Sequence, residues 1–541
     1  MDNDNSNVLS LLTYTCLALG GMFILNKLRK IGSRGSGLPP GPPTLPLMGN
    51  IHQFPTEYTA VKFSQWGNEY GGLFSLKIGP GTIVVVTSPR FVKELIDRRG
   101  TTTGSRPHFR MLQIITDGLN VGMMPYGPTW KNTRKAIQMF LTKEACMRHL
   151  PIERAEAIQL LYDMIKQPEN TFTHIQRHAT SLILSVVFGV RSPRYENSTV
   201  TEFIEVQHEV EALLEPGAHP PIDLMPILEY IPERWASWKG ICRGLRTKQQ
   251  ELYFRLRDKC EARIRENRRN GSFMESLFDQ QEKLGLTRDI IGYIGGVSLE
   301  GGSVTAVSHL QTFVLLMAYH PEIQAKAHQE LDQVVGQRLP TLEDYDHLPY
   351  IQAIAREVHR FYPAVPMGLP HESTSDETVG GYFIPKGSTI FMNIYGIYHS
   401  EEHFDEPEVF NPDRYMQSEF GTKPGADTTG FRNDLHFGGG RRICPGILLG
   451  DIMVSMNVMN LLWAFNFEAT DLEKRDPRIP IKHTDFVSGL ATGPNPYKCN
   501  IQPRNQGIED TIRDEYTLSR PIFSMFEHEL SDEEKTFVKN W

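Results

Sequence analysis

The segment FGGGRRICPG at residues 437–446 constrains the chain more than any other stretch. It sets one cysteine, Cys444, between a run of glycines and Pro445, in a chain with six cysteines among 541 residues. The six are far apart and no CxxC occurs, so neither a disulfide framework nor a zinc ribbon explains this one. Backbone N–H groups of a glycine-rich turn can point at a thiolate, and a helix that starts after Cys444, with Pro445 first, adds its positive dipole end. One thiolate cannot complete a zinc or iron–sulfur site, but it can be the axial ligand of a haem.

This segment also resembles a known family signature. It fits the FxxGxRxCxG pattern of the cytochrome P-450 haem-thiolate monooxygenases through Phe437, Gly440, Arg442, Cys444 and Gly446. Two further matches occur in the family's order. Residues 357–360 (EVHR) fit its ExxR, and FNPDRY at residues 410–415 fits its later arginine motif. The resemblance implies that Glu357, Arg360 and Arg414 form a buried triad.

A third match concerns the cofactor's carboxylates. Trp130 and Arg134 fit the family's WxxxR, and a spacing of four residues puts them on one helix face. The resemblance implies that both donate to a haem propionate, for which arginine is well suited. It gives the same role to His371, in GLPHES, and to Arg442 in the cysteine loop. The alternative for the WxxxR pair is a core tryptophan beside a surface arginine.

The central helix departs from the family. Its usual (A/G)Gx(D/E)T is here Gly301–Gly302–Ser303–Val304–Thr305, so valine replaces the acid. The resemblance implies that small residues such as Gly302 leave room for dioxygen and that the Thr305 hydroxyl hydrogen-bonds it. Proton delivery is then in question. Glu300, one turn before Val304, either supplies protons through water or only pairs locally.

The N-terminal region predicts a membrane anchor. Residues 8–25 carry no charge and span about 27 Å as a helix, enough for a thin bilayer. Lys27, Arg29 and Lys30 follow, which predicts that the rest of the chain is cytoplasmic, and no signal-peptide pattern is present. Residues 38–50 contain five prolines and predict a semi-rigid hinge.

The remaining sequence predicts a mainly α fold with a minor β portion. A hairpin is expected over residues 74–87, and long helices over residues 235–268, 289–319, 322–335, 350–361 and 445–464. Short strands and turns are expected over residues 378–390. The resemblance implies a single large haem domain with the cytochrome P-450 fold over residues 51–505. Residues 506–541 are expected to be an acidic, peripheral extension.

Together these features predict a haem-thiolate monooxygenase anchored in the endoplasmic reticulum membrane. The resemblance implies haem b, dioxygen and an NADPH–cytochrome P-450 reductase that docks near Lys131, Lys135 and Arg441. The sequences of the cysteine loop and of residues 38–50 resemble those of fungal family members that act in natural-product pathways. Apolar residues at 107–124, 294–302, 364–369 and 486–490 predict a bulky, largely apolar substrate, with aromatic molecules among the candidates. The net charge of −8 argues against nucleic acid as a partner. Two alternatives stay open: oxidative coupling or ring formation, which the valine at 304 favours, and a non-redox haem-thiolate isomerase.

Overall fold

A computed structural model describes residues 31–196, 198–214, 222–223, 226–470 and 481–541, and five positions between 14 and 22. The expected membrane anchor at residues 8–25 therefore lies largely outside the described residues. Of its described positions, Tyr14, Leu17, Leu19 and Met22 are helical and exposed.

The described chain is mainly helical, as expected. Its α-helices are α2 Thr59–Tyr70, α3 Pro89–Phe91, α4 Arg110–Thr116, α5 Pro128–Phe140, α6 Lys143–Lys166, α7 Thr171–Phe188, α8 Ser198–Leu214, α9 Ser237–Arg265, α10 Phe273–Asp279, α11 Gln281–Leu284, α12 Arg288–Tyr319, α13 Pro321–Val334, α14 Pro349–Phe361, α15 Ile394–Tyr398, α16 Arg414–Gln417, α17 Ile447–Ala464, α18 Gln506–Leu518, α19 Arg520–Ser524 and α20 Asp532–Asn540. The short 3-10 or π-type turns are η1 Ile51–Gln53, η2 Val92–Asp97, η3 Pro168–Asn170, η4 Pro226–Tyr230, η5 Glu233–Trp235, η6 Leu342–His347, η7 Leu435–Phe437, η8 Gly440–Arg442 and η9 His483–Asp485. The strands are β1 Leu73–Ile78, β2 Gly81–Val86, β3 His371–Glu372, β4 Glu377–Val379, β5 Tyr382–Ile384, β6 Thr389–Met392, β7 Phe465–Ala469 and β8 Cys499–Pro503.

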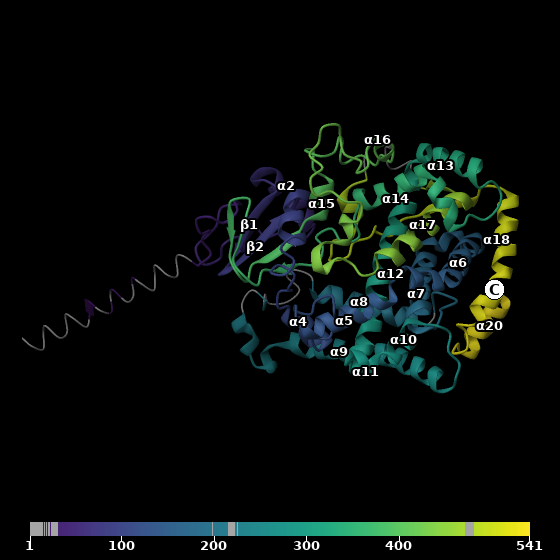
Figure 1. Ribbon diagram of the computed structural model, residues 1–541, viewed down its shortest axis with the longest axis horizontal. Coiled ribbons are helices and arrows are strands. Elements are labelled where there is room, and N and C mark those ends of the chain that lie inside the picture. The colour runs from purple at the N-terminus through teal and green to yellow at the C-terminus, as the bar shows by residue number, and fades with distance from the viewer. Residues whose placement is uncertain are drawn as a thin grey trace, which may run out of the picture.

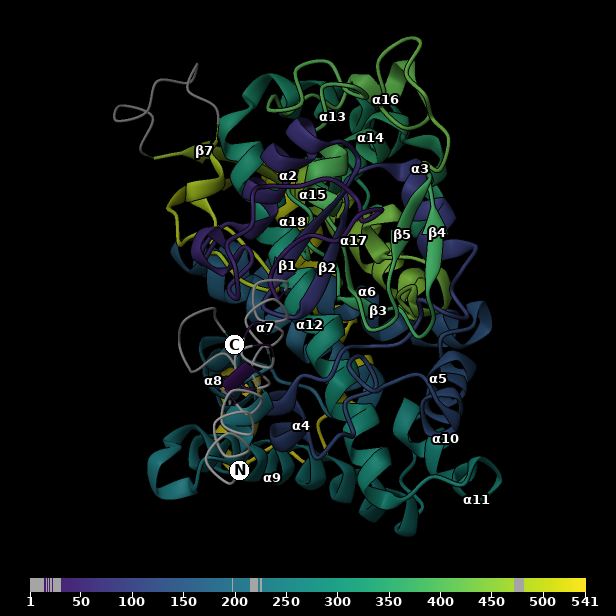
Figure 2. The same ribbon diagram turned by 90° about the vertical axis from the view of Figure 1, so that its left-hand side faces the viewer.

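The strands form three small sheets. The largest has the order β1-β2-β6-β3, in which β2 and β6 are parallel and the other pairs are antiparallel. The hairpin expected over residues 74–87 is confirmed as β1 and β2. Figure 1 shows these two strands at one end of the molecule and the C-terminal helices α18 and α20 at the opposite end. In Figure 2, seen from the sheet side, β1 and β2 lie in front, with α9 below them and α16 above.

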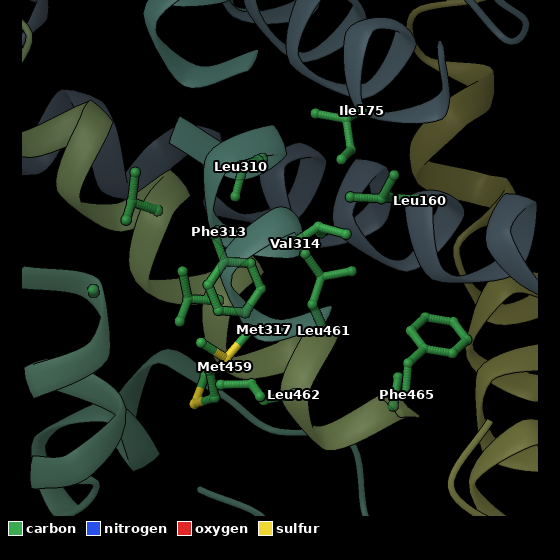
Figure 3. Close-up of a cluster of buried hydrophobic side chains, with 14 of the residues drawn as sticks. Leu160, Ile175, Leu310, Phe313, Val314, Met317, Met459, Leu461, Leu462 and Phe465 are labelled. Carbon is green, nitrogen blue, oxygen red and sulfur yellow. The ribbon is translucent and has the colours of Figure 1, made fainter. Parts of the chain in front are cut away.

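Helix α12 runs through the middle of the molecule. Thr287 caps its first turn by accepting from the N–H of Ile290, and no proline interrupts its 32 residues. In Figure 3 its Leu310, Phe313, Val314 and Met317 pack with side chains of α17, α6 and α7 in the main buried cluster. A helix that is apolar on every side is stable in water only when it is covered in this way.

Two helices, α12 and α17, are long and apolar enough to cross a membrane, among the residues that the structure describes. Their most apolar windows are 50% and 78% buried inside the protein, respectively. Both are core helices of this fold, and neither is the expected anchor.

The proline-rich segment at residues 38–50 is not a free-standing hinge. Ser75 of β1 donates its N–H to Pro40 O at 2.7 Å, and Asn50 and Lys77 exchange hydrogen bonds at 2.6 Å and 2.8 Å. Arg34 donates to the carbonyls of Gly41 and Ser75 at 2.7 Å and 2.9 Å. The segment is extended, as its prolines predict, but it is held along β1, so the folded domain begins before residue 51.

The C-terminal segment at residues 506–541 is not peripheral. It forms α18, α19 and α20, and its Ile508, Ile512, Tyr516, Phe523 and Phe526 belong to the main buried cluster. Its apolar residues recur at helical spacing, which the prediction overlooked because charged residues lie between them.

Candidate haem-thiolate site

Cys444 lies in a loop that is closed by the protein's own backbone. Its N–H donates to Phe437 O at 2.9 Å, so the two ends of the FGGGRRIC segment meet. Its Sγ accepts from the N–H of Gly446 at 3.3 Å. Cys444 is partly exposed, and so are the residues after it in the first turn of α17. The thiol therefore borders open space, with one backbone donor aimed at it.

The run of glycines does not point its N–H groups at the sulfur, as the sequence suggested. Gly440 has φ of +57°, and a Cβ there would lie 2.3 Å from Ile96 O. Its N–H donates to Asp97 Oδ1 at 2.8 Å. The glycines instead let the loop fold tightly against the end of η2. Within the described part of the chain, the one backbone N–H that donates to Sγ is that of Gly446, which follows the cysteine.

Helix α17 begins at Ile447, two residues later than expected. Gly446 is its N-cap, and Gly446 O accepts the first helical hydrogen bond from Gly450 at 2.8 Å. Because the Gly446 N–H turns back to Sγ, Pro445 lies outside the helix. The prediction that a helix N-terminus follows the cysteine is nevertheless correct. Burial raises the pKa of the Cys444 thiol, while the Gly446 N–H and the nearby Arg134 lower it.

Three buried or partly buried arginines, Arg106, Arg134 and Arg442, converge beside this loop. Arg442 donates to Gly104 O at 2.7 Å, and Arg106 donates to Pro370 O at 2.8 Å. Arg134 donates to the carbonyl of Ile443, and its Nε is buried with no partner. Among the described residues, no acid forms an ion pair with any of the three arginines.

The proximity of the three arginines to one another lowers the pKa of two of them. Burial, together with repulsion from Arg442 and Arg134, lowers the pKa of Arg106 to about 9. Burial and repulsion from Arg134 lower the pKa of Arg442 to about 10. Buried cations of this kind are stable only when an anion compensates them. The cluster therefore fits a ligand that brings carboxylates, as the two propionates of haem would.

The other expected cofactor residues join this cluster. The Arg442 guanidinium lies over the Trp130 ring, 4.0 Å from its centre. His371 is buried in β3, its Nδ1 is 2.9 Å from Thr103 O, and burial with the charge of Arg106 lowers its pKa to about 3. The alternative of a surface arginine at 134 does not hold, because Arg134 reaches the cysteine loop. Phe437 places its ring edge 3.7 Å from where a Cβ on Gly450 would be, under the start of α17.

The expected triad is confirmed. Arg360 makes two hydrogen bonds to Glu357, at 2.8 Å and 2.9 Å, and Arg414 reaches the same carboxylate at 3.1 Å. Both Glu357 and Arg360 are fully buried. Arg360 also donates to Tyr398 O at 2.8 Å and to Pro407 O at 2.9 Å, so the triad fastens α14 to the loops that precede the cysteine segment.

One face of α12 is open at the expected oxygen-binding turn. Gly301 is exposed, and beyond its own stretch of α12 no described residue comes within 4 Å of where its Cβ would be. Thr305, one turn later, donates its hydroxyl to Gly301 O at 2.7 Å. Val304 is partly buried against the core cluster that contains Trp130. The open space therefore lies beside Gly301 and Thr305.

Gly302 has a different role from the expected one. A Cβ there would lie 2.8 Å from the side chain of Ile183 on α7. Its small size lets α7 and α12 approach each other, so room beside the helix comes from Gly301 and not from Gly302.

Glu300 is turned toward α9. Its Oε1 accepts from the hydroxyl of Tyr253 and from Gln249 Nε2, the latter at 3.1 Å. Burial raises the pKa of its carboxyl group, although the bond from Tyr253 acts in the opposite sense. Of the two roles considered for Glu300, the local pairing is present, and no hydrogen bond links it to Thr305 among the described residues.

Sequence reasoning missed Arg106, Tyr253 and Gln249. Arg106 belongs to the stretch GSRPHF, which carries no signal of its own. Its role depends on the carbonyls of Gly122 and Leu369, which only the fold brings to it.

These features define a protein that presents one cysteine at a helix N-terminus, beside a cationic cluster suited to a dicarboxylate cofactor. The sequence model of the family described as "Cytochrome P-450" matches residues 39–501. A cytochrome P-450 monooxygenase of Armillaria gallica is 44% identical over 502 residues, which cover 92% of this chain and 96% of that one. The cytochrome P-450 monooxygenase yanC of Aspergillus niger is 38% identical over 499 residues, covering 89% and 92% of the two chains.

Solved structures give the same fold. A zebrafish cytochrome P-450 solved with progesterone superposes with a TM-score of 0.68 at 24% identity, covering 82% of this chain and 99% of that chain. A second, solved with abiraterone, has a TM-score of 0.66. The chain belongs to the cytochrome P-450 family. It is accordingly an oxidoreductase of the monooxygenase type that uses haem with a cysteine thiolate ligand.

Proposed function

We propose that Cys444 supplies the haem thiolate and that the chain oxidises a bulky, largely apolar organic molecule in fungal secondary metabolism. The observation that carries this proposal is the meeting of the Cys444 loop with three arginines that pair with no acid in the described part of the chain. When bound there, haem supplies the activation of dioxygen that side chains cannot perform. The protein's part is to hold the cofactor, orient the substrate and control protons.

Each group of residues has a distinct part in this proposal. Arg106, Arg134, Arg442, His371 and Trp130 hold the cofactor's carboxylates. Phe437 and Gly446 shape the thiolate's surroundings, because Gly446 donates its N–H to Sγ.

The open turn of α12 would position the reacting oxygen and its protons. Thr305 presents a hydroxyl on the face where Gly301 leaves space. Glu300 is the acid nearest in sequence to that turn, and we propose that it passes protons toward Thr305 through water. Burial raises the pKa of the Glu300 carboxyl group, and a carboxyl group that binds its proton more tightly is better suited to act as a proton donor.

Electrons would come from an NADPH-dependent reductase at the endoplasmic reticulum membrane. Lys131, Lys135 and Arg441 are exposed, and Arg441 and Lys131 both contact Tyr126 beside the cysteine loop. A cationic surface of this kind suits an acidic partner.

Oxidative coupling is the second candidate, because Val304 keeps the side of the turn apolar. A non-redox isomerase is the third, and it would need no electrons.

Turnover with reductase and NADPH tests the proposal. We expect NADPH consumption to depend on Cys444 and to yield a product that carries one added oxygen atom. A product that differs from its substrate by the loss of two hydrogen atoms would favour coupling. Conversion of substrate without NADPH would favour the isomerase and contradict the proposal.

A further inference from the structure

A cleft opens on the surface between α2, α15 and the loop that follows α15. The two helices lie side by side in both views (Figures 1 and 2), and the Asn393 side chain donates to Ala60 O at 2.9 Å between them. The cleft has a volume of about 430 Å³, which is enough for a small ligand. None of the residues placed at the haem-thiolate site lines it, so it is a separate feature of the molecule.

The wall of this cleft is acidic. Glu401, Glu406 and Glu408 line it, whereas no described lysine or arginine does. Burial and the negative charge of Glu401 raise the pKa of the Glu408 carboxyl group, although the charge of Arg360 acts in the opposite sense. Carboxylates that lie close together on one surface attract cations. The cleft therefore suits a positively charged ligand.

A nearly buried histidine also lines the cleft. His399 is 6% exposed, and its Nδ1 lies 3.0 Å from Tyr395 O, to which it must donate because a carbonyl only accepts. Burial and the charge of Arg360 hold the pKa of His399 well below its usual range, so the ring is neutral and Nε2 carries a lone pair. Among the described residues Nε2 has no hydrogen-bond partner, and it is not one of the enclosed atoms. This acceptor therefore opens onto the cleft.

We propose that the cleft binds the guanidinium group of an organic cation, either a free alkylguanidinium or an arginine side chain. The guanidinium donates to His399 Nε2 and to the carboxylates of Glu401 and Glu408. Its alkyl part lies against Val61 and Val409, which also line the cleft, and covers Val409, which is 43% exposed. A guanidinium fits because it has five N–H donors and the cleft offers acceptors on several sides.

Other ligands fit the cleft less well. In the described part of the chain, no three His, Cys, Asp or Glu side chains are placed so that they could hold a metal ion. An anion would meet three carboxylates, and like charges repel. An ammonium group has only three donors and is more strongly hydrated than a guanidinium, so it loses more when it is brought against the buried edge of His399.

Titration calorimetry with a matched pair of probes tests the proposal. Full-length, haem-loaded protein is titrated with butylguanidinium and with butylurea, which has nearly the same shape and also carries N–H donors but has no charge. We expect butylguanidinium to bind about tenfold more tightly, as one charge-assisted hydrogen bond would give. A guanidinium stays protonated and so cannot bind iron, and the haem absorption band should therefore not move.

Three variants locate the binding. Glu408→Gln and His399→Phe should each remove most of the preference for butylguanidinium. The phenylalanine keeps a ring against Tyr395, on which His399 is stacked with centres 3.8 Å apart, but has no Nε2. Glu419→Gln removes an equal charge from an exposed residue outside the cleft and should keep the preference. If thermal unfolding shows that His399→Phe is not folded, Glu401→Gln takes its place.

A short alanine peptide with one central arginine distinguishes the two sources of the group. If the peptide binds like butylguanidinium, the cleft takes the arginine side chain of a partner; if only butylguanidinium binds, it takes a free molecule. The proposal is overturned if neither guanidinium binds, if butylurea binds as tightly as butylguanidinium, or if Glu419→Gln weakens binding as much as Glu408→Gln does. The haem spectrum is independent of all these results, so the proposed function is tested separately.

Discussion

Val304 occupies the position at which the family motif has an acid. How protons reach the site therefore depends on where neighbouring side chains point. The motif could be identified from the sequence, because it consists of given residue types at a fixed spacing. The direction of Glu300 was not, since it is set by Tyr253 and Gln249 on a helix about fifty residues earlier in the chain. The same holds for Gly302, whose contact with Ile183 decides its role.

Glu300→Gln tests the proton route. We expect it to lower product formed per NADPH by about tenfold and to raise hydrogen peroxide release, because an amide cannot pass on a proton at neutral pH. Haem content should stay unchanged. Adding Val304→Asp to Glu300→Gln should recover part of the coupling, since the acid then precedes Thr305 as in the family motif. Unchanged product-to-NADPH ratios in the single variant would remove Glu300 from the proton route.

Among the helices, α12, α13 and α14 were predicted to within one residue at each end. Helices α12 and α14 begin one residue before the expected positions and end where expected. The start of α17 was missed because a hydrogen bond to the Cys444 sulfur, and not helix propensity, decides where Gly446 points. The C-terminal helices were missed because charged residues lie between their apolar residues, as Glu509, Asp510 and Arg513 do in α18.

Three histidines stack between α12, α14 and the cysteine loop. The His359 ring lies 4.1 Å from that of His309 and 3.8 Å from that of His436. Burial lowers the pKa of all three, that of His359 to about 3, and the Arg432 charge adds to the effect at His436. The stack joins the elements that position Cys444, and it is stable only while the rings are neutral.

The stack predicts a loss of stability in mild acid. The unfolded chain binds protons on these histidines below about pH 6.5, whereas folded His359 stays neutral until about pH 3. Stability therefore falls as the pH falls through this window. His359→Phe should reduce the loss between pH 7.5 and 5.5 by about 1.4 kcal/mol, as measured by urea unfolding. The exposed His52, changed to phenylalanine, is the control. An unchanged pH dependence in His359→Phe would show that the stack does not titrate as described.

At the level of the whole molecule, the C-terminal helices close the end opposite the large sheet. The Tyr516 ring of α18 stacks on Tyr162 of α6 with centres 4.0 Å apart. Trp541 donates its Nε1–H to Asp163 Oδ1 at 3.0 Å, and Tyr162 donates to the carbonyl of Trp541 at 3.1 Å. Glu529 reaches the buried Arg263 of α9 at 3.1 Å. The chain end thus fastens α6 and α9 together.

Tyr516→Ala should lower the free energy of unfolding by about 3–4 kcal/mol, because it removes a buried aromatic side chain. Leu518, on the same helix, is 69% exposed, and Leu518→Ala should change it by less than about 0.5 kcal/mol. Thermal and urea unfolding of the two variants measure the difference. If Tyr516→Ala and Leu518→Ala unfold with equal free energies, the packing of α18 on α6 does not stabilise the fold.

The cationic surface beside the cysteine loop predicts how the reductase docks. Charge reversal at Lys131 or Arg441 should raise the KM for reductase by about tenfold at low salt and by less at high salt. Reversal of Lys386, exposed on the turn between β5 and β6, changes the net charge equally and should have little effect. Turnover driven by added hydrogen peroxide, which bypasses the reductase, should be normal in all three variants. Loss of the peroxide-driven reaction in the Lys131 and Arg441 variants would point to a damaged site and not to docking.

The absorption spectrum of the reduced protein with carbon monoxide tests the central claim most directly. If Cys444 is the axial ligand, the wild type shows the red-shifted band typical of a thiolate, and Cys444→Ala loses that band together with activity. Cys499 of β8, whose pKa burial raises to about 12, is the control, and Cys499→Ala should keep the band. A band typical of an imidazole ligand in folded wild type, or a thiolate band that survives Cys444→Ala, would contradict the account.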